Sequence, residues 1–96
     1  MKRPLILIGG GGHCKSVIEV AESAGYDIKG ILDMPDEVGK EVLPGHKVIG
    51  TDDEIPQYVE ECDFIITVGF IKNPALRIKL YNKVKAAGGR LATIIA

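Results

Sequence analysis

A run of four glycines, Gly9–Gly12, carries the clearest chemistry of the sequence, because it joins an apolar segment to a stretch with helical periodicity. Glycines let the backbone approach a pyrophosphate with no Cβ in the way. The free N–H groups and positive dipole end of a helix N-terminus also favour anions. His13, Lys15 and Ser16 follow the run and add side-chain donors. A simple strand-to-helix turn needs only one or two glycines, so this run with His13 and Lys15 predicts phosphate binding.

The spacing of these glycines fits the dinucleotide fingerprint G-x-G-x-x-G only in part. Counted from Gly9, the third glycine would fall on Cys14, and counted from the next glycine it would fall on Lys15. Asp33 lies about 20 residues further on, where a carboxylate can accept hydrogen bonds from ribose hydroxyls or from a base edge. The other interpretation of Asp33 is a solvated carboxylate at a strand end. The pattern therefore favours a nucleotide, whereas the incomplete fingerprint is weak evidence for NAD.

Other basic side chains have simpler interpretations. His13 could act as a general base, but a helix N-terminus disfavours its protonated form, which favours a ligand contact instead. His46 lies between a glycine and a lysine and is expected to be a solvated loop residue. Arg77 lies in the first turn of the helix expected after the third strand, on the ligand side, and is a candidate for a ligand or interdomain contact. The solvated face of this helix is predicted to carry Lys72, Lys79, Lys83 and Lys85.

The alternation of apolar patterns along the chain predicts the elements that position these residues. Continuous apolar runs indicate buried strands, and spacings of three and four indicate helices. We expect strands at 5–8, 28–33, 63–68 and 91–95, helices at 13–24, at 51 or 52 to 61 and at 73–88, and a loop at 34–47 with a short extended piece at 47–49. This order predicts an α/β, Rossmann-like parallel sheet of about four strands with helices on both faces.

Composition narrows the class of protein. With 96 residues there is room for one domain, and a net charge of -1 gives no footprint for nucleic acid or an anionic membrane surface. No apolar run approaches the roughly 18–20 residues that span a bilayer. Cys14 and Cys62 form no CxxC pair, so we expect buried thiols, no metal site and a cytoplasmic location. Because residues 94–96 end the chain within an apolar strand, we expect an N-terminal part of a longer protein.

Several segments resemble the N-terminal domain of the PglD/NeuD family of sugar O- and N-acyltransferases. The Gly-Gly-His-x-Lys turn within Ile8–Ile18 and the Val-Ile-Gly-x-Asp-Asp segment Val48–Asp53 are fairly specific when they occur together. Gly30–Asp33, Asp63–Gly69 and Leu91–Ile95 continue the similarity, which covers essentially the whole chain. The resemblance implies that residues 1–96 are a single nucleotide-sugar-binding domain.

In this family the N-terminal domain binds the sugar substrate, often a UDP-linked amino sugar, in bacterial glycan biosynthesis. A C-terminal left-handed β-helix domain trimerises, binds acetyl-CoA and carries the histidine base. The resemblance therefore implies a parent acetyltransferase, with no catalytic residue and no cofactor site in this chain. Several members have a second acid after the one matching Asp33, where this chain has Met34. The implied substrate contacts are Gly10, Gly12, His13 and Lys15 for the diphosphate or sugar, Asp33 and Ile49 for the nucleoside, and Gly69 as the pocket floor.

Two alternatives come from other functional classes. One is a regulatory domain that binds NAD or a CoA-type nucleotide without sugar chemistry, and the other is a purely structural α/β module. The missing third glycine, together with His13 and Lys15, favours the sugar-nucleotide interpretation.

Overall fold

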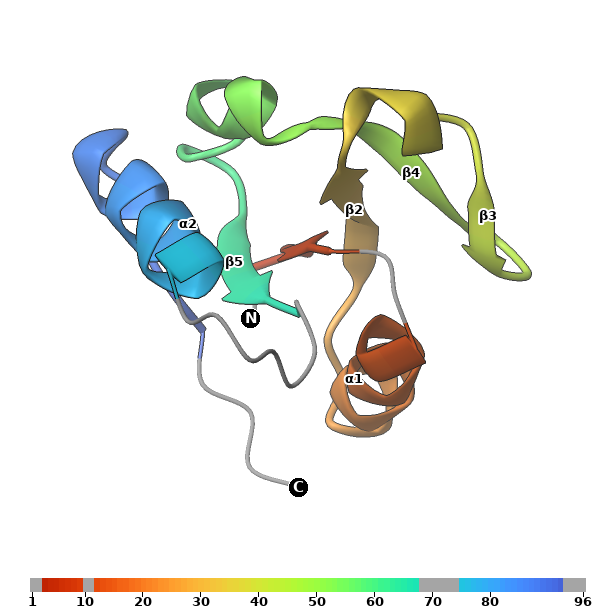
Figure 1. Ribbon diagram of the computed structural model, residues 1–96. Coiled ribbons are helices and arrows are strands. Elements are labelled where there is room, and N and C mark those ends of the chain that lie inside the picture. The colour runs from red at the N-terminus through yellow and green to blue at the C-terminus, as the bar shows by residue number, and fades with distance from the viewer. Residues whose placement is uncertain (1–2, 10–11, 68–74, 93–96) are drawn as a thin grey trace.

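The computed structural model describes residues 3–9, 12–67 and 75–92. The described strands form one sheet in the order β3-β4-β2-β1-β5, parallel except for β3, so the predicted Rossmann-like α/β class is confirmed. Helices α1 and α2 pack against opposite faces of this sheet (Figure 1). The elements in chain order are β1 (Leu5–Ile8), α1 (Gly12–Ser23), β2 (Ile28–Asp33), the 3-10 helix η1 (Pro35–Glu37), β3 (Glu41–Leu43), β4 (His46–Thr51), the 3-10 helix η2 (Asp52–Gln57), β5 (Asp63–Ile66) and α2 (Ala75–Ala86).

Strand β1 is the centre of the molecule because it pairs in parallel with both β2 and β5. All four of its side chains are buried, and alternate ones point to opposite faces of the sheet. Leu5 and Leu7 pack with Ile18 of α1, whereas Ile6 and Ile8 pack in the cluster that contains Leu80 of α2. A strand buried on both faces requires the continuous apolar run that the sequence shows.

The expectation of a loop over residues 34–47 was wrong in part. This region contains η1, β3 and the start of β4, and β3 pairs antiparallel with β4 around the turn at Gly45, whose φ is 84°. The extended piece predicted at 47–49 is the middle of β4. The hairpin lies at the sheet edge and β3 has only three residues, of which Glu41 is exposed and the other two are partly buried. Such a strand leaves no apolar alternation for periodicity to detect.

A helix to Glu61 was also expected, but the chain forms only the short η2. Pro56 lies inside it and has no N–H to donate to the carbonyl four residues earlier, which disfavours a regular α-helix. Of the two caps that the sequence allowed, Thr51 and Asp52, the structure has Thr51, whose N–H donates to Oε2 of Glu54 at 2.7 Å. A Glu side chain that accepts from the N–H of the N-cap residue in this way is one half of a capping box. It fixes the direction in which the chain leaves β4.

The last third of the chain follows the prediction where it is described. Strand β5 ends at Ile66, and α2 is described from Ala75, so the helix start expected at residues 73–74 lies outside the described residues. Of the strand expected at 91–95, the described part is a parallel bridge between Leu91 and Phe64, and the Ala92 N–H donates to the Phe64 carbonyl at 2.8 Å. Among the described residues, no helix has the length and apolar character needed to cross a bilayer.

Candidate functional site

The carboxyl ends of the parallel strands gather at one edge of the sheet, where ligands bind in folds of this class. The chain runs from β1 to β2 and β4 on one side and then returns to β5 on the other side of β1. This edge is tied together by Thr67, which follows β5. Its hydroxyl donates to the Gly9 carbonyl at 2.6 Å, and its N–H donates to the Ile8 carbonyl at 2.8 Å. Gly9 has a φ of 115°, a conformation that favours glycine.

The helix predicted after the glycine run is present as α1. Gly12 is the first residue of α1 and His13 lies in its first turn, directly beyond β1. Gly10 and Gly69 lie outside the described residues. Lys15 is exposed on α1, one turn from its N-terminus. The helix dipole and the ammonium group therefore place positive charge at the same end of β1.

Lys15 and Asp33 line the same cavity, which we call the α1-side cavity and which has a volume of about 340 Å³. Asp33 ends β2, and one of its carboxylate oxygens accepts the Met34 N–H at 2.9 Å. Glu37 and Lys40 lie on the same cavity and form an ion pair at 2.6 Å. A hydrogen bond from this ammonium to Glu37 raises the pKa of Lys40. The structure thus brings together two of the predicted substrate contacts, Lys15 and Asp33, over the strand ends.

A larger cavity of about 410 Å³ lies on the other side of Asp33, and we call it the α2-side cavity. Its lining includes apolar side chains from the ends of β1 and β2 and from α2, and Gly9 borders it. Met34 and Pro35, at the start of the segment after β2, form another part of its lining. Charged side chains are contributed by Asp33, Asp52, Asp53, Lys79 and Lys83. An apolar lining with a few charged groups is typical of small-molecule sites.

Lys83 holds two of these carboxylates. Its Nζ donates to Oδ2 of Asp52 at 2.9 Å and to Oδ1 of Asp53 at 2.7 Å. The hydrogen bond from Lys83 lowers the pKa of Asp53, and the two carboxylates raise the pKa of Lys83. Asp53 and Lys83 are therefore both charged at neutral pH. This clamp joins α2 to the start of η2 across the cavity.

The sequence interpretation missed this clamp, the position of Lys79 beside the cavity, and the position of His46. The Asp-Asp pair appeared only as part of a resembling segment, and Lys83 and Lys79 were assigned to a solvated helix face, although both line the cavity. His46 was expected in a loop, but it begins β4, and its Nε2 lies 3.3 Å from Oε2 of Glu22 at the end of α1. Contacts between residues far apart in the sequence leave no local pattern, so spacing could not have found them.

Ile49 has a different position from the other predicted contacts. Its side chain covers Gly30 of β2, is 38% exposed, and lines neither of the two cavities. Its contact with a nucleoside therefore stays a prediction. Within the described part of the chain, no three His, Cys, Asp or Glu side chains gather as metal ligands would.

Cys14 lies beneath the strand ends but is not a reactive group. It is fully buried, and burial raises the pKa of its thiol to about 11, although a hydrogen bond with Thr67 acts in the opposite direction. Burial also raises the pKa of Cys62, and both thiols are free. Because the thiolate is the nucleophile, both cysteines are packing residues at neutral pH.

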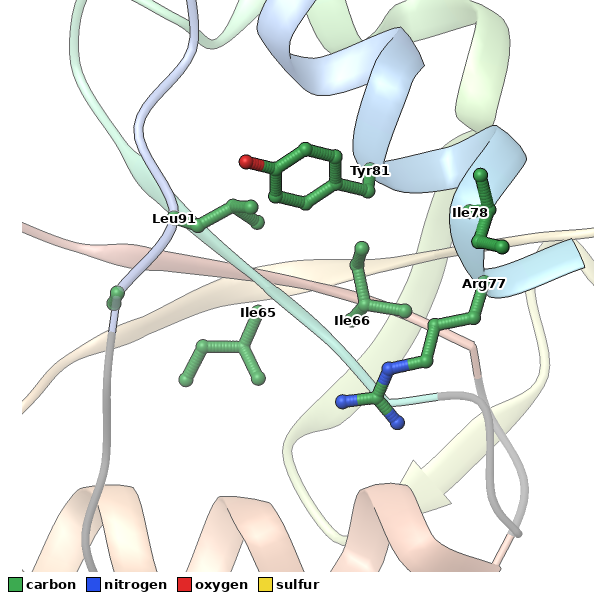
Figure 2. Close-up of a pocket in the computed structure, with 7 residues that line it drawn as sticks. Ile65, Ile66, Arg77, Ile78, Tyr81 and Leu91 are labelled. Atoms are coloured by element: carbon green, nitrogen blue, oxygen red, sulfur yellow. The ribbon is translucent and has the colours of Figure 1, made fainter. Parts of the chain in front are cut away.

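Arg77 lines a third cavity of about 340 Å³, which we call the apolar cavity (Figure 2). Ile65 and Ile66 come from β5, and Ile78 and Tyr81 come with Arg77 from α2. Leu91, after α2, borders the same space. None of these residues lines the two cavities beside Asp33. Arg77 therefore does not join the predicted substrate contacts that the structure describes.

Comparisons with known proteins place this geometry in context. The perosamine N-acetyltransferase of Caulobacter crescentus, solved with CoA and GDP-perosamine, is 31% identical with a TM-score of 0.78. The alignment covers 96% of this chain and 42% of that chain. The acetyltransferase domain of PglB from Neisseria gonorrhoeae, solved with acetyl coenzyme A, is 30% identical with a TM-score of 0.71, over 93% of this chain and 42% of that one.

A Rex-family repressor called RSP has a TM-score of 0.69 at 20% identity, so this likeness shows the fold alone. No curated protein matches the sequence. The chain spans less than half the length of the two acetyltransferase chains. Residues 4–84, which include the glycine turn, Asp33 and the lysine clamp, match the description "PglD N-terminal domain". The chain therefore belongs to the PglD N-terminal domain family.

Proposed function

We propose that this chain is the nucleotide-sugar-binding domain of an acetyl-CoA-dependent sugar N- or O-acetyltransferase. The observation that carries the proposal is the edge beside Asp33, where Gly9, the start of α1, Lys15 and two cavities meet over the strand ends. Family membership and the GDP-perosamine held by the Caulobacter enzyme support the sugar-nucleotide class.

Each part of this edge suits one part of such a ligand. A diphosphate carries negative charge, which the N-terminus of α1 and the ammonium of Lys15 stabilise. The carboxylate of Asp33 accepts hydrogen bonds from ribose hydroxyls. The apolar floor of the α2-side cavity, formed by Ile8, Leu32 and Leu80, offers a surface for a flat base. The phosphates would thus lie between the base and the sugar that is acetylated.

In this proposal the domain contributes positioning rather than bond chemistry. Binding energy from the nucleotide would hold the acceptor amine or hydroxyl in place, which converts acetyl transfer into an effectively intramolecular reaction. The histidine base, the acetyl-CoA site and trimer contacts would belong to a β-helix domain of a longer cytoplasmic parent protein. That assignment fits the 42% of the acetyltransferase chains that this chain covers.

The sequence resemblance favoured UDP, whereas the Caulobacter enzyme was solved with a GDP-linked sugar. The proposed function therefore covers nucleoside diphosphate sugars with either base. Titration calorimetry of this chain with GDP, UDP and NAD tests it directly. We expect a nucleoside diphosphate to bind more tightly than NAD. NAD as the tighter ligand would support the regulatory alternative, and binding by none of the three would contradict the proposal.

Two variants test the assigned contacts. Lys15→Ala and Asp33→Asn should each weaken the better nucleoside diphosphate about tenfold, the change expected from losing one hydrogen bond to a charged group. Lys47→Ala and Asp36→Asn are matched controls, because both side chains are exposed and line neither cavity beside Asp33. Unchanged affinity in both site variants would remove this edge as the binding site.

A further inference from the structure

The α2-side cavity carries an inference about which base is bound, and this inference rests on the proposed function. We infer that the cavity selects guanine over uracil, with the carboxylate of Asp52 accepting hydrogen bonds from N1–H and the N2 amino group of the base. Asp52 would then determine the specificity for the base, and the substrate would be a GDP-linked sugar rather than a UDP-linked one.

The position of the cavity places the base near Asp52. Asp33 ends β2 at the position suited to a ribose, and the cavity continues from Asp33 to the start of η2. A base beyond the ribose would therefore extend towards the clamp formed by Lys83. Met34, which is 61% exposed, lies on this path. Its thioether suits contact with an aromatic ring.

The hydrogen-bonding edges of the two bases differ in a way that a carboxylate can distinguish. Guanine presents two adjacent donors, N1–H and N2–H, and an ionised carboxylate is an acceptor with two oxygens. This pairing is bidentate, like the pairing of arginine with a carboxylate. Uracil presents a single N–H between two carbonyl oxygens. Those oxygens would face the carboxylate without a donor, so the same position disfavours uracil.

Asp52 is better suited to this role than Asp53, although Lys83 contacts both. The Asp52 side chain is 27% exposed and the Asp53 side chain is 83% exposed. A hydrogen bond is stronger where water is largely excluded, so the more buried carboxylate discriminates better. Lys83 contacts Oδ2 of Asp52, and each carboxylate oxygen has two lone pairs, so both oxygens can still accept from a base.

The first test uses the unmodified chain. Calorimetric titration with GDP, IDP and UDP should give affinities in that order, with GDP about 10- to 100-fold tighter than UDP, the size expected for one bidentate base contact. IDP lacks the N2 amino group and should fall between the two. UDP binding as tightly as GDP, or more tightly, would overturn the guanine inference and leave the proposed function standing. Binding of no nucleotide would instead contradict the proposed function.

The second test changes the specificity rather than removing it. An Asn side chain at position 52 offers one acceptor and one donor, which match N1–H and the C2 carbonyl of xanthine. Asp52→Asn should therefore weaken GDP about 10- to 100-fold and tighten XDP. Because a misfolded chain gains no ligand, the gain of XDP separates specificity from structural damage.

Asp53→Asn is the matched variant, since it also loses a contact with Lys83. It should affect GDP only through the clamp and should gain no XDP. Asp36→Asn, an exposed position on η1, should leave both affinities unchanged. A gain of XDP in Asp53→Asn and not in Asp52→Asn would overturn the assignment to Asp52. Unaltered GDP and XDP binding in Asp52→Asn would do the same.

Discussion

The α2-side cavity and the apolar cavity share helix α2, yet their linings differ. The first lies over the ends of β1 and β2 and combines an apolar floor with three carboxylates and two lysines. The second lies between β5 and α2, where Arg77 is its one charged lining residue among those the structure describes. Both have volumes of several hundred Å³. Size alone therefore does not distinguish the candidate site.

The difference follows from where each cavity lies on the sheet. Strand ends expose backbone groups and tolerate charged side chains, whereas the cavity beside β5 is lined by partly buried apolar side chains such as Ile65. On helix α2, Lys79 and Lys83 line the first cavity, and Ile78 and Tyr81 line the second. The first arrangement suits a charged ligand. The five predictions that follow test this contrast, from the largest expected effect to the smallest.

The largest effect is expected at Gly9, which borders the α2-side cavity with a φ of 115°. Gly9→Ala should destabilise the fold by about 1–3 kcal/mol and abolish nucleotide binding, because alanine is strained in this conformation. Urea unfolding and calorimetry measure the two effects. Gly39→Ala is the control, since Gly39 has a φ of 93° with open space around it. The affinity of this control variant for the nucleotide should be unchanged. A Gly9 variant that binds the nucleotide with normal affinity would contradict the assignment of the α2-side cavity as the nucleotide site.

The second effect concerns alkaline pH and Cys14, which packs beneath the charged edge. The fold raises the thiol pKa from 9.0 to about 11, so the folded state favours the neutral thiol. The stabilisation is full below pH 9 and is lost as the pH rises towards 11. Urea unfolding should show a loss of about 2 kcal/mol over this range that is absent in Cys14→Ala. Equal pH dependence in both proteins would show that burial does not suppress this thiol.

The third effect compares two lysines of α2. Lys83→Met should weaken nucleotide binding about two- to fivefold, because the clamp no longer holds Asp52 and Asp53. The folding stability should change little, since exposed ion pairs contribute little. Lys85→Met is the matched control, because its ammonium lies 5.8 Å from the ring centroid of Tyr81, on the side of the apolar cavity. Equal losses in the two variants would contradict a clamp-specific role.

Acid should remove the same clamp. The hydrogen bond from Lys83 lowers the pKa of Asp53 in the fold below its unfolded-state value of 3.8. The stabilisation that the Asp53 carboxylate gives to the clamp is therefore fully present above pH 3.8, and it is lost as the pH falls through the lower folded value. The difference in nucleotide affinity between the unmodified chain and Lys83→Met should therefore persist at pH 5. Its disappearance at pH 5 would mean that another group controls the clamp.

The smallest effect is expected in the apolar cavity. Ile78, which is 57% exposed, lines that cavity and neither of the others. Ile78→Ser should leave nucleotide affinity within about twofold, because surface substitutions away from a site change little. Calorimetry with the same nucleotide checks this. A tenfold loss of nucleotide affinity would show that the nucleotide binds in the apolar cavity rather than in the cavities beside Asp33.

The sequence predicted most where local pattern and burial agree. The four apolar residues of β1, the glycine turn and the spacing of α1 each indicate one structure, and Lys15 and Asp33 indeed line one cavity. The hairpin β3–β4 was missed because a half-exposed edge strand has little periodicity. The clamp was missed for another reason: Lys83 and Asp52 are separated by 31 residues, and only folding brings them together.

The most direct test of the charged edge is an NMR titration of this chain with GDP, followed by amide shifts in 15N–1H spectra. The account predicts that the largest changes occur at Gly9, Lys15, Asp33 and Asp52, whereas Ile78, Tyr81 and Leu91 change little. Changes concentrated around the apolar cavity, with the strand ends unaffected, would contradict it.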